Sequence, residues 1–125
     1  MISVEVSNRS GVDVDEPAAV ELAGKVLHAE GVDDGELGIA FVGEEEMRAL
    51  KREHLELDEV TDVLSFPIDG REQIPEGVPR ALGDVVLCPQ VVGDAWQWPL
   101  THGLLHLLGY GHGSEMEARE DVLLR

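Results

Sequence analysis

The sequence lacks several features that would place it in a familiar class of protein. It has one cysteine, Cys88, among 125 residues, so an intramolecular disulfide is impossible. No segment approaches the ~20 consecutive apolar residues of a membrane-spanning helix. Residues 1–6 carry no basic cluster and no signal-peptide core, so we expect a cytoplasmic protein without a membrane partner. We also find no internal repeat, and the length fits a single domain over residues 1–125.

Basic residues are scarce as well. Nine Lys and Arg residues stand against 26 Asp and Glu residues, which gives a formal net charge of −17. Affinity for a nucleic-acid backbone comes mainly from Lys and Arg side chains that neutralise phosphates. The charge therefore argues against non-specific nucleic-acid binding, and we expect no DNA partner.

The order of hydrophobic patterns predicts the fold class. Alternating or continuous apolar runs predict strands over residues 2–7, 37–42, 60–66 and 81–87, with a loop over 68–80. Helices are predicted from Glu16 to the stop at Gly31, from Glu44 to about residue 55, from Pro99 through the next residues, and from Ser114 to about residue 124. This β-α-β-α-β-β-α-α order predicts an α+β domain whose helices pack on a small mixed sheet of about four strands.

Three of the five histidines lie close together near the C-terminus, at His102, His106 and His112. Residues four apart share one face of a helix, so the first two imidazoles can aim at one point. Gly109 can end that helix in a left-handed turn, which lets His112 approach the same point from outside. Three imidazoles with a fourth position left to water form a catalytic zinc site. The spacing thus predicts such a site on the last-but-one helix and the following turn.

The residue after the first of these histidines is Gly103. Metallopeptidases of the His-Glu-x-x-His type use a glutamate there as the general base. Glycine cannot accept a proton, so a peptidase interpretation loses its base while the metal site is unaffected. The remaining histidines, His28 and His54, are near the ends of predicted helices and are interpreted as ordinary surface residues.

Three blocks of sequence resemble one known family. They are residues 61–67 (TDVLSFP), 82–87 (LGDVVL) and the histidine run 102–112. In this order they resemble the YbeY family of small bacterial endoribonucleases, and the resemblance covers nearly the whole chain. It implies that His102, His106 and His112 bind one Zn²⁺ ion. It further implies a cytoplasmic enzyme that cuts single-stranded RNA during maturation of the 3' end of 16S ribosomal RNA, with the small ribosomal subunit as partner.

The sequence departs from that family at several positions. Gly111 stands where the family usually has aspartate, and Leu55 stands where it usually has arginine. Arg52 lies about one helical turn before Leu55 and could contact phosphate in its place. The segment 89–100 is shorter than in the family, and so is the segment after the third histidine. These differences bear on how a substrate is positioned more than on metal binding.

The acid-base groups are less certain from the sequence than the metal ligands. Zinc held by three histidines lowers the pKa of a bound water from about 15.7 to about 7. Asp84 is our first candidate for orienting a ligand histidine or that water, and Asp62 is the second. The alternative for both is a structural role, in which an aspartate in a strand bonds to nearby backbone.

Three aromatic residues lie in or near the histidine run. We expect Trp96 and Trp98 to cover an edge of the core, although they could instead stack on unpaired bases. Tyr110 is expected to pack or to hydrogen-bond within its turn.

One rival function is a peptide or ester hydrolase using the same metal. The other is a zinc-containing ribosome assembly factor with little or no activity, although structural zinc usually has four protein ligands.

Overall fold

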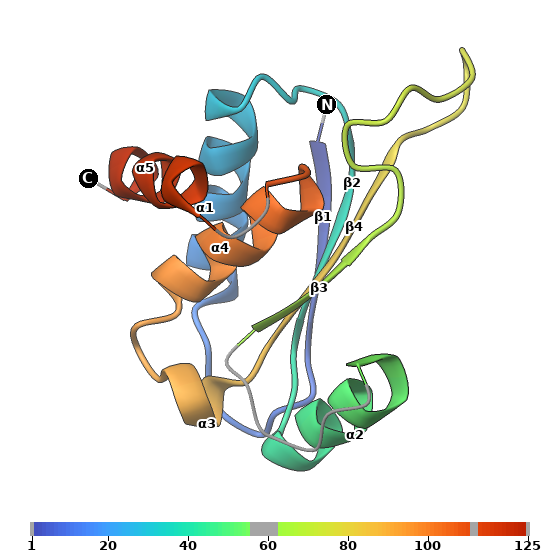
Figure 1. Cartoon of the computed structure of the whole chain (residues 1–125). Coiled ribbons are helices and arrows are strands. Elements are labelled where there is room, and N and C mark those ends of the chain that lie inside the picture. Colours follow the sequence, from blue (N-terminus) through green and yellow to red (C-terminus); the bar gives the residue numbers. More distant parts are fainter. Residues whose placement is uncertain (1, 56–62, 111–112, 125) are drawn as a thin grey trace.

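A computed structural model describes residues 2–55, 63–110 and 113–124 of the chain (Figure 1). The strands are β1 (Ile2–Asn8), β2 (Gly35–Phe41), β3 (Val63–Pro67) and β4 (Ala81–Leu87). The helices are α1 (Glu16–Ala29), α2 (Glu44–Leu55), α3 (Pro89–Val92), α4 (Gln97–Leu107) and α5 (Ser114–Leu123). The helices in the described part of the chain include none that is both long and apolar enough to cross a membrane.

The four strands form one mixed sheet in the order β1-β2-β4-β3. β1, β2 and β4 are parallel, and β3 runs antiparallel to β4 along the edge. The parallel pair β1 and β2 is joined by α1, as parallel strands require a crossover. The predicted α+β class with a small mixed sheet is confirmed.

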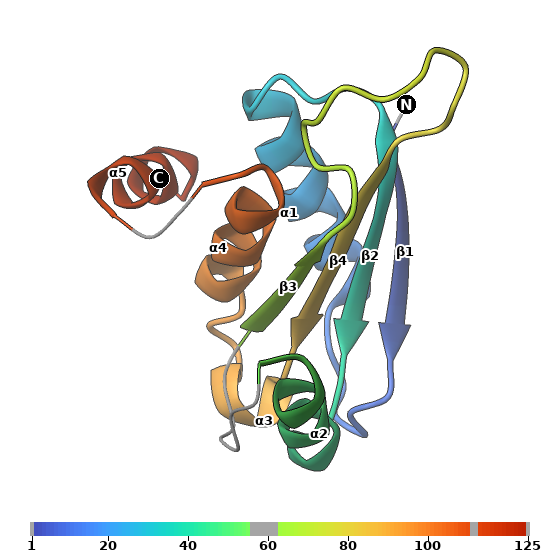
Figure 2. The same ribbon diagram turned by 45° about the vertical axis from the view of Figure 1, so that its right-hand side comes forward.

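The two faces of the sheet differ in how they are covered. Figure 2 shows α1 and α4 lying against one face, while α2 lies past the lower end of the sheet. Side chains alternate between the faces of a strand, so Ile39 and Val85, which pair in register, point together toward α1 and α4. The main core on this face includes Phe41, Leu27 and Leu104.

The opposite face holds a smaller core at the end near α2. Met47 of α2 packs there with Leu64 and Val86 of the sheet, and Cys88 is buried among them. The other end of this face carries polar side chains, among them the exposed Asp84.

The predicted boundaries that fall on described residues lie within about two residues of the observed ones. The Asp15 side chain accepts a hydrogen bond from the Ala18 backbone N–H at 3.0 Å and starts α1, with proline in the first turn. The histidine helix begins at Gln97 and not at Pro99, because a proline within the first turn lacks only an N–H that would have no helical partner. The short helix α3 was not predicted. Residues 60–62 of the predicted third strand lie outside the described residues.

Candidate metal centre

Helix α4 brings two histidines together. The Nε2 atoms of His102 and His106 are 3.1 Å apart, and the two rings meet edge to face with their centroids 4.6 Å apart. Both side chains are partly buried. The spacing of one helical turn therefore has the consequence that the sequence predicts: two imidazole nitrogens aim at one point.

The other ring nitrogen of each histidine has a fixed partner. Nδ1 of His106 lies 2.9 Å from the Tyr110 backbone carbonyl, which can only accept a hydrogen bond. Nδ1 of His102 lies 3.3 Å from a carboxylate oxygen of Glu120. Both contacts place the ring proton on Nδ1, so each Nε2 presents a lone pair. Outer partners of this kind orient the histidines that bind metals in proteins.

This geometry fits a bound divalent cation. Two lone pairs 3.1 Å apart repel each other unless a cation lies between them. Two nitrogen ligands at the usual Zn–N distance of about 2.0–2.1 Å on a tetrahedral ion lie roughly 3.3 Å apart, close to the separation found here.

The charge of Glu120 supports the same conclusion. The residue is only 5% exposed, and within the described part of the chain its Oε2 atom has no hydrogen-bond partner. A buried carboxylate is costly unless positive charge compensates it. A cation held by the two neighbouring histidines would supply that charge.

The third predicted ligand, His112, lies outside the described residues, and so does Asp62. Within the described residues no group of three or more His, Cys, Asp or Glu side chains could hold a metal ion. The three-histidine ligand set therefore stays a prediction. The turn that leads toward His112 is described as far as Tyr110, and Gly109 has the left-handed conformation predicted for it, with φ of 98°.

Gly103 allows α4 to lie directly on the sheet. A Cβ atom at this position would be 2.8 Å from Cγ1 of Val85 and 3.1 Å from Oγ of Ser65. The Ser65 hydroxyl donates a hydrogen bond to the Gly103 carbonyl at 3.0 Å. A glutamate at 103 would point into the sheet, so a peptidase-type base at this position is excluded by packing as well as by chemistry.

The structure places Asp84 away from the histidine pair. Its carboxylate lies over Gly38 of β2, on the sheet face opposite to α4, whereas its neighbour Val85 faces α4. Asp84 lines a cavity of about 520 Å³ on that open face, together with Arg9 and Phe66. The carboxylate that contacts a candidate ligand histidine is Glu120 and not Asp84.

Arg52 is not brought to the histidine pair either. It is an exposed residue of α2, which Figures 1 and 2 show past the end of the sheet, away from α4. Phosphate contact by Arg52 would therefore involve RNA that extends beyond the metal centre.

Glu120 is a residue that the sequence analysis missed. Its signal in the sequence is an acidic residue on the face of α5 that also carries the buried Met116 and Leu123. These positions are spaced as one side of a helix, and an acid in such an apolar stripe requires a partner. The partner, His102, is 18 residues earlier in the chain.

The two tryptophans have different environments. Trp96 is partly buried against the main core, as expected. Trp98 is 48% exposed, so the expectation that it covers the core is wrong. Its ring stacks on His102 with centroids 4.9 Å apart and an interplanar angle of 26°.

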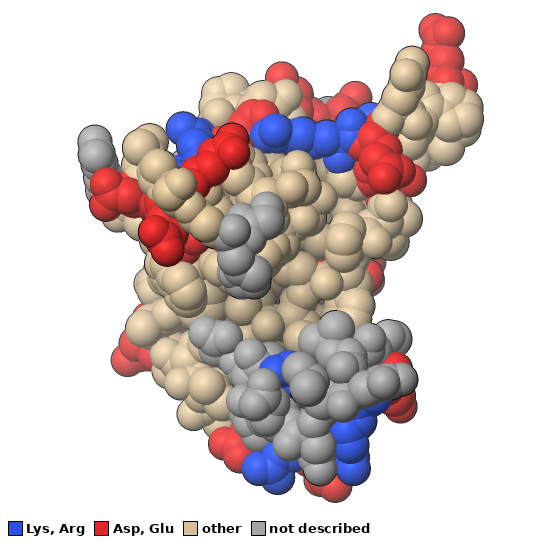
Figure 3. Space-filling model, viewed as in Figure 1, with Lys and Arg blue, Asp and Glu red and all other residues tan. Residues whose placement is uncertain are grey.

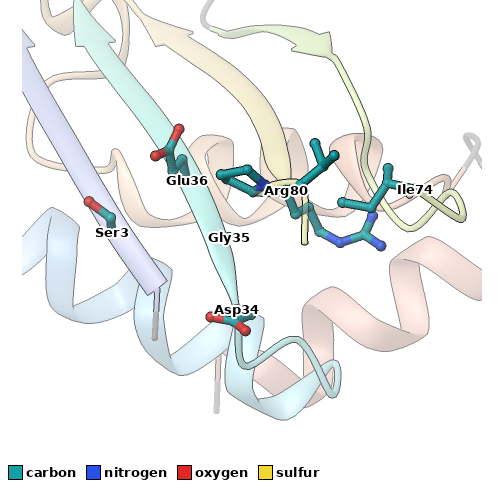
Figure 4. A pocket seen from close by; sticks show the side chains of 8 residues that line it. Ser3, Asp34, Gly35, Glu36, Ile74 and Arg80 are labelled. Carbon is teal, nitrogen blue, oxygen red and sulfur yellow. The ribbon is translucent and has the colours of Figure 1, made fainter. Parts of the chain in front are cut away.

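A separate cavity of about 350 Å³ lies at the opposite end of the sheet from α2. Figure 4 shows it between the starts of β1 and β2 and the loop before β4, with Asp34, Glu36 and Arg80 at its edges. Arg80 donates a hydrogen bond to the Gly70 carbonyl at 2.7 Å and so holds the loop in place. No histidine lines this cavity, and we assign the candidate chemistry to α4.

Comparison with known proteins identifies the family of the chain. The family model described as endoribonuclease YbeY matches residues 5–122. The chain belongs to the YbeY family. It is 42% identical to the endoribonuclease YbeY of Acidothermus cellulolyticus over 143 aligned positions, which cover 99% of this chain and 87% of the relative. It is 38% identical to the YbeY of Mycobacterium ulcerans over 141 positions, covering 99% and 79%.

Two further details of the YbeY match are informative. Both alignments are longer than the 125 residues of this chain, so these relatives contain segments that it lacks. The solution structure of TM1509 from Thermotoga maritima matches with a TM-score of 0.59 over 99% of this chain and 87% of that one. Its sequence identity is 21%, so this match concerns the fold alone.

Proposed function

We propose that this member of the YbeY family is a zinc-dependent endoribonuclease that cuts single-stranded RNA. The main support for a metal site is that the Nε2 atoms of His102 and His106 are 3.1 Å apart, while the Nδ1 atom of each ring contacts another group. Membership of an endoribonuclease family carries the reaction class. A peptidase with this site would lack its base, and a purely structural zinc would require a fourth protein ligand.

Each residue of the centre has a distinct task. His102, His106 and His112 would hold the ion, while Glu120 and the Tyr110 carbonyl keep the first two rings in the required orientation. When bound, zinc supplies a water of lowered pKa and stabilises negative charge on a phosphoryl oxygen. Gly103 keeps the helix against the sheet and so fixes where the ring pair lies.

Trp98 suits a single-stranded substrate. Stacking on His102 holds its ring beside the centre, and about half of its surface is open to solvent. An unpaired base can lie on such a ring, whereas a base within a duplex is already stacked on its neighbours. We infer that Trp98 receives a base next to the scissile phosphodiester.

The charge distribution limits how RNA binds. In the described part of the chain, Arg9, Arg71 and Arg119 are among the basic residues that form ion pairs with carboxylates. Figure 3 shows basic side chains near α2 and in a band at the other end of this face, with acidic side chains around its rim. We therefore expect cleavage to stay level or rise as salt increases, because salt screens the repulsion. A steep fall with salt, as for ordinary phosphate-driven binding, would contradict this expectation.

We further propose a role in 16S ribosomal RNA maturation at the small subunit, in the cytoplasm. This part rests on the family resemblance and on charge. A surface of net charge −17 complements basic ribosomal proteins better than exposed RNA. Binding to purified small subunits, compared with binding to naked 16S RNA, tests it, and equal binding to both would argue against it.

The central test joins metal content to activity. We expect the purified protein to contain about one zinc per chain and to cut an unstructured oligoribonucleotide but not the same sequence in a duplex. A chelator should abolish the activity and added zinc should restore it. Casein in place of RNA tests the peptidase alternative. Zinc content with no RNA cleavage would favour the assembly factor.

A further inference from the structure

A second buried carboxylate lies behind the metal centre. Glu30 follows the last residue of α1, and its side chain is only 3% exposed. It takes no part in the chemistry proposed above. A charged group so removed from water requires strong partners, and Glu30 has them.

Three side chains donate hydrogen bonds to this carboxylate. The Tyr110 hydroxyl donates to Oε1 at 2.6 Å. Arg119 donates to Oε2 through Nε at 2.9 Å and through Nη2. Arg71 donates to Oε1 at 3.2 Å and to the Glu30 backbone carbonyl at 3.0 Å, and its guanidinium lies 5.9 Å from the centre of the Tyr110 ring.

Two of these partners belong to segments that also contact the candidate ligand histidines. The backbone carbonyl of Tyr110 accepts the hydrogen bond from Nδ1 of His106. Arg119 precedes Glu120, whose carboxylate contacts Nδ1 of His102. The turn after α4 therefore supplies the hydrogen-bond partner of His106, and α5 supplies that of His102. Glu30 contacts both of these segments.

We propose that Glu30 is a positioning residue for the metal centre, acting through Tyr110 and Arg119 to hold the groups that orient His106 and His102. The inference rests on the proposed zinc site. It concerns a residue just after α1 that is 72 positions earlier in the sequence than the first candidate ligand.

The charge of Glu30 is suited to this task. Burial alone would raise the pKa of its carboxyl group, but the hydrogen bonds from Tyr110 and Arg119, with the charges of Arg119 and Arg71, outweigh burial and lower the pKa. Glu30 is therefore an anion at neutral pH. The charge-assisted hydrogen bonds that it accepts are stronger and more directional than neutral ones.

The test is the zinc affinity of Glu30→Gln, measured by competition with a chromophoric chelator. Glutamine keeps the size of the side chain and one carbonyl oxygen but loses the charge that pairs with Arg119. We expect the zinc dissociation constant to rise about tenfold, at the lower end of the loss found for outer partners of metal ligands. Tyr110→Phe removes only the hydroxyl, keeps the carbonyl, and should weaken zinc binding by a smaller factor.

Two controls separate positioning from general stability. Glu46→Gln breaks the exposed Arg9–Glu46 ion pair and should leave zinc affinity unchanged. The melting temperature of each metal-free variant shows that affinities are compared between folded proteins. If Glu30→Gln melts too low for titration, Tyr110→Phe decides the question.

Each outcome is decisive. A wild-type zinc affinity in folded Glu30→Gln, or in Tyr110→Phe where that variant must decide, overturns the inference while the proposed function stands. Failure of the wild-type chain to bind zinc overturns both. Weakened zinc binding in Glu30→Gln and Tyr110→Phe, with Glu46→Gln unaffected, supports the positioning role.

Discussion

The two faces of the four-stranded sheet differ in the helices that cover them and in the side chains that they present. On one face, α1 and α4 cover an apolar layer (Figure 2), and α4 also carries the histidine pair. On the other face, the same strands present Glu5, Ser7 and Asp84 around an open cavity. Moving one residue along β4, from Val85 to Asp84, crosses from one environment to the other. The sheet thus supports the helix that carries the two described candidate ligands, His102 and His106.

The largest expected effect comes from removing one ligand histidine. His106→Ala should remove zinc and lower RNA cleavage by more than the roughly 100-fold typical of losing an outer partner. Asp84→Asn, on the opposite face, should leave zinc affinity unchanged. Metal analysis and cleavage rates of both variants test this contrast.

Two outcomes would break the contrast between the faces. Zinc loss in Asp84→Asn would mean that the open face contributes to the centre after all. Unfolding of His106→Ala in circular dichroism would point to a structural ion, because a catalytic ion can be lost from a folded protein.

A pair of glycines tests how tightly each face is packed. Gly103→Ala would place a Cβ atom 2.8 Å from Val85 Cγ1 in the covered layer, and we expect a loss of stability of about 1–2 kcal/mol after the gain in helix propensity. The three atoms nearest to a Cβ at Gly38, on the open face, all belong to the Asp84 side chain, and the Oδ1 atom 2.0 Å away can rotate toward water. Gly38→Ala should be neutral or stabilising. Urea denaturation measures both, and equal losses would contradict the difference in packing.

An aromatic residue on each side shows which face RNA follows. Trp98→Ala should raise KM about tenfold with little change in kcat, since stacking on one base contributes binding. Phe66→Leu, beside the open cavity, should leave KM unchanged. Trp96→Phe is the matched control for losing an indole near α4. A larger KM effect at Phe66 than at Trp98 would move the RNA to the open face.

The sequence predicts those parts of the site that depend on local geometry. The helical spacing of His102 and His106 and the left-handed turn at Gly109 are properties of a few consecutive residues, and the structure has both. The outer partners depend on tertiary contacts, because Glu30 and Glu120 are far in sequence from the histidines that they serve.

The position of Asp84 could not be predicted for a different reason. Residues 85–88 are buried without alternation, since α1 and α4 cover one face and α2 covers the end of the other. A strand buried on both sides carries no period-two signal, so the sequence does not tell which way Asp84 points. Trp98 was misjudged for a related reason. Its exposure depends on tertiary packing, and in the structure its ring stacks on His102 while about half of it remains exposed.

The smallest expected effect is a change in the shape of the pH–stability curve. The pKa of Glu30 is lowered in the folded protein because the hydrogen bonds and charges around it outweigh its burial. A lowered pKa contributes stability above the unfolded value, about 4.3 for glutamate, and this contribution is lost as pH falls through the folded pKa. The difference in stability between the wild type and Glu30→Gln, both metal-free, should therefore be full at pH 6 and narrow progressively below about pH 4.3.

The exposed pair on the open side supplies the contrast. Arg9 and Glu46 have side chains 54% and 38% exposed, and surface pairs contribute only about 0–1 kcal/mol. Glu46→Gln should therefore shift the urea midpoint little between pH 3 and pH 7. If the difference in stability between the wild type and Glu30→Gln stayed constant as the pH falls, the negative charge of Glu30 would not contribute to that difference. The charge of Glu30 would then make no measurable contribution to the free energy of unfolding through its contacts with the turn after α4 and with α5.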